Sequence, residues 1–295
     1  MLIDLRTLTA PQKQQWLQHA IAPRPIAFAS TMNSKGDVNL SPFSFFNLFS
    51  SQPPIVIFSP SRRVRDNSTK HTLENVLQVP EVVINVVDYH MVHQTSLSSC
   101  EFPAGVNEFE KAGFTMEPST HVKPPRVKES KIQMECKVIE VKPLGDQGGA
   151  GNLVICEVVL MHVDDSILNE AGSMIDQRKI HHVARLGGDW YARVDDGSLF
   201  HVTKPNTELG IGIDALPPSI RSSKILTGNH LGQLANVQVL PGIDAAYHDH
   251  RFKEIVQYFS SNPADMEMEL HRHAAHLLDQ GKLQEAWQVL LADIY

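Results

Sequence analysis

The sequence predicts a mainly β fold with short helices over residues 1–200, followed by an α-helical C-terminal extension over residues 201–295. Short apolar runs separated by turn-forming residues fill the first half, which is typical of an all-β domain with insertions. Residues 132–138 alternate apolar and polar side chains, which is the period of a half-exposed strand. From His250 onward the apolar residues instead recur at helical spacing.

The first predicted strand covers residues 26–29 and leads into a turn at residues 33–37, where asparagine, serine, glycine and aspartate gather. Residues 38–40 then form the returning strand of a hairpin. Two runs rich in β-branched residues follow at 55–58 and 82–87, and their continuous apolar character predicts buried strands.

A short helix is predicted between these two strands, beginning near Lys70, because polar capping residues at 66–69 precede apolar residues at helical spacing. The alternating strand from residue 132 and a second long strand at 152–163 flank a glycine-rich segment at 145–151. This arrangement predicts a long hairpin with a loose tip.

The character of the chain changes after about residue 194. Residues 195–198 and 204–206 have the composition of connecting segments. Further helices are predicted at 266–278 and 283–291, with Gly281 suited to the C-terminal cap of the first. No second copy of this helical hairpin occurs, so we expect an appendage that packs on the first domain or on a partner subunit rather than a repeat array.

Composition excludes several classes of protein. The 33 acidic residues outnumber the 26 basic ones, for a formal net charge of −7, so a nucleic acid partner is not expected. The longest apolar run, residues 153–163, is too short to cross a membrane, and the N-terminus lacks the pattern of a secretory signal. The 3 cysteines fit neither a zinc site nor a disulfide framework, and Cys136 and Cys156 fall in apolar runs as core residues. We therefore expect a cytoplasmic protein.

The sequence contains no nucleophile elbow, zinc-protease motif or nucleotide-binding phosphate loop, so we predict no catalytic side chain and no metal site, with the chemistry supplied by a cofactor. Residues 210–215 match a dinucleotide-binding fingerprint, but the prolines at 217–218 stop the helix that it requires. His271, His273 and His276 are interpreted as a polar helix face, because no cysteine or carboxylate completes a metal site.

Several ordered segments resemble the flavin reductase-like proteins of the FMN-binding split-barrel superfamily. They are Arg24–Thr31 (RPIAFAST), Asn39–Asn47 (NLSPFSFFN), Pro53–Ser59 (PPIVIFS), Lys70–Val76 (KHTLENV), Pro124–Val127 (PPRV) and Ala184–Gly188 (ARLGG). The resemblance implies a Greek-key split β-barrel, bound FMN, and a homodimer with the flavin at the subunit interface. The sequence departs from the family at His71, where an acidic residue is common.

The resemblance also implies which residues contact the flavin. The side chains expected beside the ring are Ser41, Phe43, Ser44 and Asn47, with Ser59 near the ribityl chain and Thr31 nearby. Pro42 is expected to prevent regular sheet pairing, which would turn backbone amides and serine hydroxyls toward the ring.

The phosphate of FMN needs a cation, hydroxyl donors and the positive end of a helix. Lys70 and Thr72 offer these groups at one helix start. Arg63, in a stretch with two further arginines that looks inserted relative to the family, either adds a second cation or is a solvated loop charge. Arg185 either borders the nicotinamide side of the flavin or organises a chain end.

The function implied by the resemblance is an FMN-dependent oxidoreductase. NAD(P)H would reduce the flavin, which would pass electrons to free flavin, a quinone or another small-molecule acceptor. Two alternatives remain at this point: an electron-transfer flavoprotein of the flavoredoxin type, reduced by a partner protein, and a non-catalytic flavin-binding scaffold whose helical tail recruits a partner.

Overall fold

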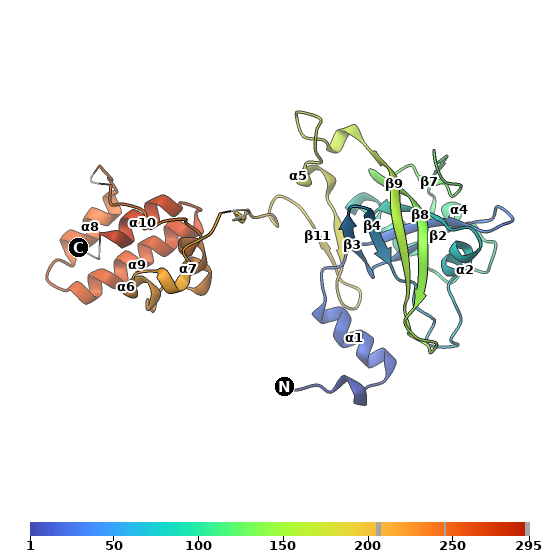
Figure 1. Cartoon of the computed structure of the whole chain (residues 1–295), viewed down its shortest axis with the longest axis horizontal. Helices are drawn as coiled ribbons and strands as arrows, with labels where there is room; N and C mark the ends of the chain where they lie inside the picture. Colours follow the sequence, from blue (N-terminus) through green and yellow to red (C-terminus); the bar gives the residue numbers. More distant parts are fainter. Residues whose placement is uncertain (205–207, 245, 293–295) are drawn as a thin grey trace. The chain divides into compact units, whose positions relative to one another are not determined.

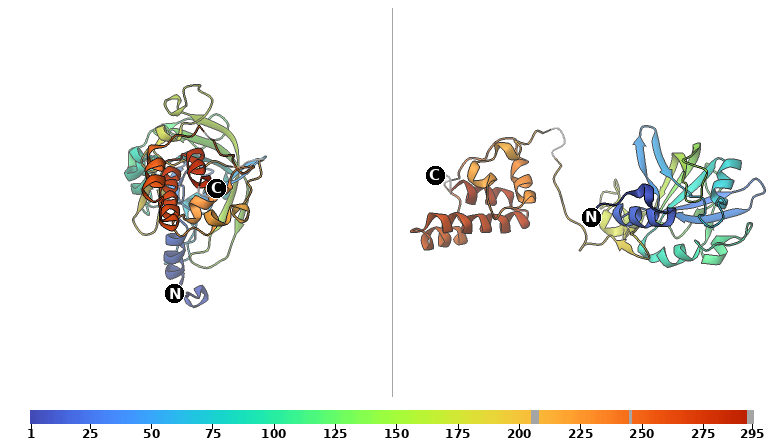
Figure 2. Two further views of the ribbon diagram at one scale, coloured as in Figure 1. Left: turned by 90° about the vertical axis from the view of Figure 1, so that its left-hand side faces the viewer. Right: turned by 90° about the horizontal axis from the view of Figure 1, so that it is seen from below.

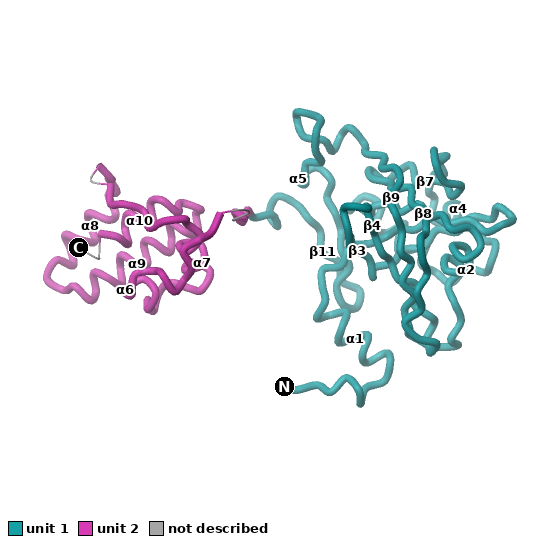
Figure 3. Tube along the Cα trace, viewed as in Figure 1, with its two compact units in different colours: residues 1–200 teal, residues 201–295 magenta. Residues whose placement is uncertain are grey.

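The computed structural model describes residues 1–204, 208–244 and 246–292. The chain divides into two compact units, Met1–Phe200 and His201–Tyr295 (Figure 3). Of the connecting segment expected at 204–206, Pro205 and Asn206 lie outside the described residues. Each unit has its own core, and each is described by itself.

A seven-stranded antiparallel sheet forms the first unit, with strands in the order β2-β1-β5-β8-β9-β4-β3 (Figure 1). Its strands are β1 (Ala27–Met32), β2 (Val38–Phe43), β3 (Phe46–Ser51), β4 (Pro54–Phe58), β5 (Glu81–Val86), β8 (Ile132–Pro143) and β9 (Asn152–Val163). Two small sheets pair β6 (Met116–Glu117) with β7 (Arg126–Val127), and β10 (Val183–Arg185) with β11 (Tyr191–Arg193). The mainly β prediction is confirmed.

Short helices surround this sheet. They are α1 (Ala10–Ala20), α2 (His71–Gln78), α3 (Val92–Leu97), α4 (Glu108–Ala112) and α5 (Gln177–Ile180), with 3-10 turns η1 (Leu5–Thr7), η2 (Tyr89–Met91) and η3 (Asp165–Ile167). Helix α1 lies outside the sheet and buries none of its residues (Figures 1 and 2). Helix α2 begins directly after Lys70, as predicted.

The barrel core is built from the inward faces of the predicted strands. Fully buried Val82 and Ile84 of β5 pack in one cluster with Cys136 and Cys156, so the two cysteines are core residues as predicted. The hairpin of β1 and β2 is confirmed, with Ser30 opposite Leu40.

Three predictions about this unit are wrong. Strand β8 is not half-exposed where it begins, because Gln133 and Glu135 are buried. The Glu135 carboxylate accepts the backbone N–H of Thr120 at 2.7 Å, so a loop covers the face expected to meet water. The tip of the β8–β9 hairpin is not loose either. The backbone N–H of Gly149 donates to the Arg62 carbonyl at 3.0 Å, so the tip is bound to the loop after β4.

The third error concerns Pro42. It pairs with Phe28 within β2 instead of interrupting the strand. Strand β2 lies at the end of the sheet order, where a proline is tolerated because its nitrogen can point away from the neighbouring strand. The segment therefore keeps its sheet pairing and leaves its outer edge unpaired by strands.

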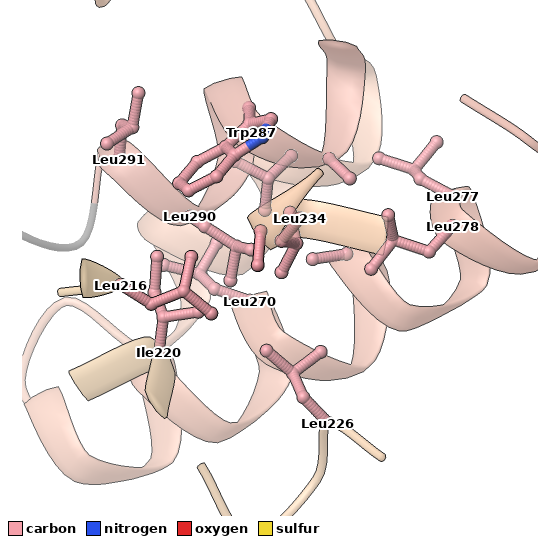
Figure 4. Packing of buried hydrophobic residues seen from close by; sticks show 14 of the residues in the cluster. Leu216, Ile220, Leu226, Leu234, Leu270, Leu277, Leu278, Trp287, Leu290 and Leu291 are labelled. Carbon is pink, nitrogen blue, oxygen red and sulfur yellow. The ribbon is translucent and has the colours of Figure 1, made fainter. Parts of the chain in front are cut away.

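Among its described residues, the second unit contains helices and connecting segments but no strand. The helices are η4 (Ile213–Ala215), α6 (Pro218–Arg221), α7 (Gly228–Ala235), α8 (His250–Tyr258), α9 (Pro263–Asp279) and α10 (Leu283–Leu291). Their apolar faces meet around Trp287, whose side chain is 0% exposed and is surrounded by leucines of α7, α9 and α10 (Figure 4). Because residues 210–215 lead into a 3-10 turn, they do not form a dinucleotide-binding strand and helix.

A glycine turn joins α9 to α10. Gly281 has a φ of +74°, its N–H donates to the Leu278 carbonyl at 3.0 Å, and the N–H of Lys282 donates to the Leu277 carbonyl at 2.9 Å. These two bonds form a Schellman motif, which confirms the predicted role of Gly281.

The histidines of α9 do not form a solvated polar face. His271 is buried, with Nδ1 2.7 Å from Ser223 Oγ, and His273 Nε2 lies 2.7 Å from Asp249 Oδ2. Both rings connect α9 to another segment of the second unit, so the polar-face interpretation is wrong for these two residues.

Candidate functional site

A shallow polar cavity lies where the outer end of β2 meets the start of α2. We name it the Lys70 cradle, and its lining residues are Gln18, Ser41, Pro42, Phe43, Ser44, Phe45, Ser59, Ser61, Lys70 and Ser99. The Ser59 N–H donates to the Phe45 carbonyl at 2.8 Å, which holds the residue after β4 against the bend that follows β2. The structure thus brings together Ser41, Phe43, Ser44, Ser59 and Lys70, five residues predicted to bind the flavin.

Lys70 supplies the cation of this cradle. Burial lowers the pKa of Lys70, and the nearby Arg63 guanidinium lowers it further, while the Glu101 carboxylate acts in the opposite direction. Among the described residues, Lys70 Nζ makes no hydrogen bond or ion pair. The residue is also the N-cap of α2, yet its side chain does not cap the helix. A half-buried cation therefore stands at the positive end of a helix without a bound anion from the chain.

Serine hydroxyls surround this cation. In the part of the chain that the structure describes, the side chains of Ser41, Ser44, Ser59 and Ser61 make no hydrogen bond. Ser59 is a buried residue that lines the cavity, and its hydroxyl is not among the fully buried atoms without a partner. The cradle therefore offers unsatisfied donors beside a cation.

Aromatic rings form the apolar side of the cradle. The ring centroids of Phe43 and Phe58 lie 5.4 Å apart, so Phe43 is fixed by packing against the barrel core. Phe45, which also lines the cradle, is exposed. A cation, free hydroxyls and an apolar wall are the groups that a phosphate-bearing flat ring such as FMN requires, so the residues present fit this cofactor.

A second, smaller cavity continues from the first and shares Ser41, Lys70 and Ser99 with it. Thr72 lines it, but the Thr72 hydroxyl is buried and donates to Asn39 Oδ1 at 2.7 Å. A hydroxyl carries one proton, so the Thr72 hydroxyl cannot also donate to an anion. The backbone N–H is then the group of Thr72 that can donate to one.

Glu108 of α4 lies behind Asn39. Its carboxylate accepts Asn39 Nδ2 at 2.9 Å and the backbone N–H of Leu40 at 3.0 Å. Burial raises the pKa of Glu108, although these hydrogen bonds oppose the shift. The chain of bonds from Glu108 through Asn39 to Thr72 fixes the start of α2 against β2.

Arg63 lines the same second cavity but is held by its own loop. Its Nη1 donates to Ser68 Oγ at 3.0 Å and to the Thr69 carbonyl, and its Nε donates to Glu101 Oε1 at 3.1 Å. The guanidinium thus braces the loop that precedes Lys70 and adds positive charge nearby.

Three predicted residues lie elsewhere. Thr31 is buried and accepts a hydrogen bond from Asn75 Nδ2 at 3.1 Å. Asn47 is exposed on β3, where its Oδ1 accepts the N–H of Leu48 at 2.8 Å. Arg185 lines a different cavity, with its guanidinium 4.5 Å from the ring centroid of Tyr191.

Sequence reasoning missed the segment at 98–102, together with Asn39 and Glu108, all of which line the second cavity. The adjacent serines at 98–99 were the available signal, since serine clusters mark turns and loops. Within residues 1–204, 208–244 and 246–292, no group of three or more histidine, cysteine or acidic side chains is placed to hold a metal ion.

Comparisons with known proteins give the family of the first unit. The model of the flavin reductase like domain matches residues 19–184, which is more than half of the chain and lies within the first unit. A protein from Aquifex aeolicus is 40% identical over 173 residues, which cover 59% of this chain and 85% of that protein.

Two solved structures extend the comparison. Nitrilotriacetate monooxygenase component B from Bacillus cereus is 29% identical, with a TM-score of 0.64 over 68% of this chain and 98% of that chain. The 2-nitrobenzoate 2-nitroreductase NbaA from Pseudomonas fluorescens is 28% identical, with a TM-score of 0.62 over 72% of this chain and all of that chain. The sheet is the split barrel of such structures. The chain belongs to the flavin reductase-like family.

Proposed function

We propose that this chain is an FMN-dependent NAD(P)H oxidoreductase that passes electrons to free flavin, a quinone or another small-molecule acceptor. The observation that carries the proposal is the Lys70 cradle, in which an unpaired, half-buried cation lies beside free serine hydroxyls and a phenylalanine wall. Bound FMN would supply hydride acceptance and onward electron transfer. The neighbours named as a monooxygenase component and a nitroreductase support a redox role.

In this proposal each group of the cradle has a separate task. Lys70 and the first backbone N–H groups of α2 bind the phosphate, because both present positive charge to the same point. Ser59 binds the ribityl chain, while Ser41 and Ser44 donate to the polar edge of the ring. Phe43 provides the apolar wall, and no side chain needs to exchange a proton for the first half-reaction.

The test is anaerobic mixing of the FMN-loaded protein with NADH or NADPH in a stopped-flow spectrometer. Rapid bleaching of the flavin band with either nucleotide is the expected result. A flavin that both nucleotides leave oxidised, but that a reduced partner protein bleaches, would replace the proposal with an electron-transfer flavoprotein. A native protein that refuses FMN at micromolar concentration would contradict both.

We further propose that two copies associate over the cradle. The edge strand β3 exposes Leu48 at 65% and Phe49 at 63%, and α1 exposes Trp16 and Leu17. Gln18 of α1 and Phe45 line the same cradle, so both apolar groups border the candidate flavin site. An exposed apolar patch and an unpaired sheet edge are commonly covered by a partner.

Light scattering after size-exclusion chromatography tests the association. We expect a dimer for the native chain and a monomer with weakened FMN retention for Leu48→Asp combined with Phe49→Asp. The matched control is Ile139→Asp on β8, an exposed apolar residue outside the cradle. A native monomer that retains FMN would contradict the shared site.

We place this activity in the cytoplasm. Cys100, Cys136 and Cys156 are free thiols, which suits a reducing compartment. Among the described residues no helix is both long and apolar enough to cross a membrane.

A further inference from the structure

Another cavity, of about 440 Å³, lies in the first unit between the β10–β11 hairpin and the segment that contains η2 and α3. We name it the Arg185–Arg193 cavity, and its lining residues are Tyr89, Val92, His93, Ser96, Val183, Arg185, Asp189, Tyr191, Ala192 and Arg193. It shares no lining residue with the Lys70 cradle or with the cavity that continues from it.

The strand register places the charged groups on one face of the hairpin. Val183 pairs with Arg193 and Arg185 pairs with Tyr191, and directly paired residues of antiparallel strands point to the same side. All four residues line the cavity, with the two arginines at opposite corners of this face.

Each arginine is already stacked on an aromatic ring. The guanidinium carbon of Arg185 lies 4.5 Å from the Tyr191 ring centroid, and that of Arg193 lies 4.1 Å from the Tyr89 ring centroid. Stacking holds a guanidinium in place and leaves N–H groups at its edge for a planar anion, although Arg193 Nη2 also lies 3.4 Å from His181 Nδ1. Within the described residues, neither arginine forms an ion pair with a carboxylate.

The rest of the wall is apolar apart from Asp189, His93 and Ser96. Val92 and Val183 also line the cavity, so a ligand would meet aliphatic and aromatic surface together with guanidinium groups. Two guanidinium groups and one carboxylate line the cavity, so the charge of its wall is positive. This combination suits a flat aromatic ring that carries an anionic group at its edge.

We propose that the Arg185–Arg193 cavity is a binding site for an aromatic compound bearing a carboxylate or a phosphate. The compound is either a free aromatic acid or the adenylate part of a nucleotide, since both have this chemistry. The site is close to the cradle along the chain. Ser96 lines the cavity and Ser99 lines the cradle, and three residues of chain span at most about 11 Å.

Isothermal titration of the FMN-loaded protein tests the site with three probes: benzoate, the neutral isostere benzamide, and adenosine 5′-monophosphate. We expect at least one of the two anions to bind saturably and benzamide to bind at least about tenfold more weakly than benzoate, because the charge-assisted hydrogen bonds are lost. Tight binding of benzoate identifies a free aromatic acid, and tight binding of the monophosphate identifies a nucleotide.

Arg185→Gln combined with Arg193→Gln should lower the affinity for the anion by about tenfold to a hundredfold. Arg178→Gln is the matched control, because Arg178 is an exposed arginine of the same unit outside the cavity, and it should change affinity less than about twofold. If the double variant does not fold, Arg185→Lys with Arg193→Lys should fold and still lose affinity, since lysine keeps the charge without the planar fork.

Three outcomes would overturn the proposal. The first is no saturable anion binding below about 10 mM, a binding free energy of less than about 3 kcal/mol. The others are equal affinity for benzoate and benzamide, and unchanged anion affinity in the arginine variants. The titrations are repeated without added FMN, and flavin retention is read from absorbance. A protein that binds the anion but not FMN would contradict the proposed function and leave this site intact.

Discussion

The two units of this chain differ in how some of their polar side chains are used. In the first unit, Lys70 Nζ and the hydroxyls of Ser41, Ser44, Ser59 and Ser61 make no hydrogen bond among the described residues. In the second unit, His230 lies 3.0 Å from Asp279 and His273 lies 2.7 Å from Asp249, each joining two helical segments. These polar groups face a cavity in the first unit and join helical segments in the second unit.

This difference separates a ligand site from a structural network. A half-buried cation without an anion from the chain loses hydration and gains no ion pair, so a bound anion would stabilise it. The sequence predicted a polar helix face for the histidines of α9, but His271 and His273 join segments of the fold. Four predictions test the contrast.

The largest effect is expected in the second unit. Trp287→Ala removes a fully buried indole and should lower the free energy of unfolding of this unit by about 3 to 5 kcal/mol. Urea unfolding of the full chain, followed by circular dichroism, measures the loss. Flavin retention should stay unchanged, because the residues of the cradle belong to the first unit. Release of FMN by this variant would show that the two units depend on each other.

Lys70→Ala removes the one cation among the described residues that line the cradle and should weaken FMN binding by about 1.5 to 3 kcal/mol, the range for a charge-assisted hydrogen bond. Fluorescence titration of the protein with FMN gives the affinity. Lys35→Ala, at the exposed turn between β1 and β2, serves as the control and should bind FMN like the native chain. Equal affinity in the two variants would remove Lys70 from the site.

Asp249→Ala breaks the contacts of Asp249 with His273 and with Tyr247, whose hydroxyl donates at 3.0 Å, and should cost the second unit about 1 to 3 kcal/mol at pH 7. Burial disfavours the Asp249 carboxylate, but the hydrogen bonds from His273, Phe252 and Tyr247 outweigh it and lower the pKa.

Because the folded pKa lies below the unfolded one, this stabilisation is present above the ordinary carboxyl pKa of 3.8 and is lost as the pH falls through the folded value. The difference in unfolding free energy between native and variant chains should therefore shrink below about pH 4. A difference that stays constant down to pH 2 would exclude the carboxylate as its source.

The smallest effect is expected for Gly151→Ala. A Cβ at this position would lie 2.6 Å from Ser59 Oγ, so the hydroxyl must rotate away from its place in the cradle. We expect FMN binding to weaken by about 0.5 to 1 kcal/mol, because the rotated hydroxyl no longer donates to the ribityl chain. The rotation itself costs little to the fold. Gly228→Ala, where a Cβ meets open space, is the control for the added methyl group. Unchanged titration curves for both variants would remove Ser59 from the ribityl site.

The sequence by itself determined the strands of the main sheet except β3, the start of α2 and the α9–α10 turn. These depend on local backbone preferences: β-branched runs at 55–58 and 82–87, capping residues before Lys70, and a glycine at 281 where φ is positive. The sequence also identified the family, because the motif segments and their order along the chain can be read from it directly.

Only the tertiary structure decided which polar groups were free. Glu135 alternates with apolar neighbours and looked exposed, yet a loop folds over it. Arg185 and Lys70 belonged to one predicted site but line separate cavities. Local patterns report the backbone of a segment, whereas the partner of a side chain depends on segments far away in the chain. Contacts such as that between Asn39 and Glu108, 69 residues apart, therefore appear only once the chain is folded.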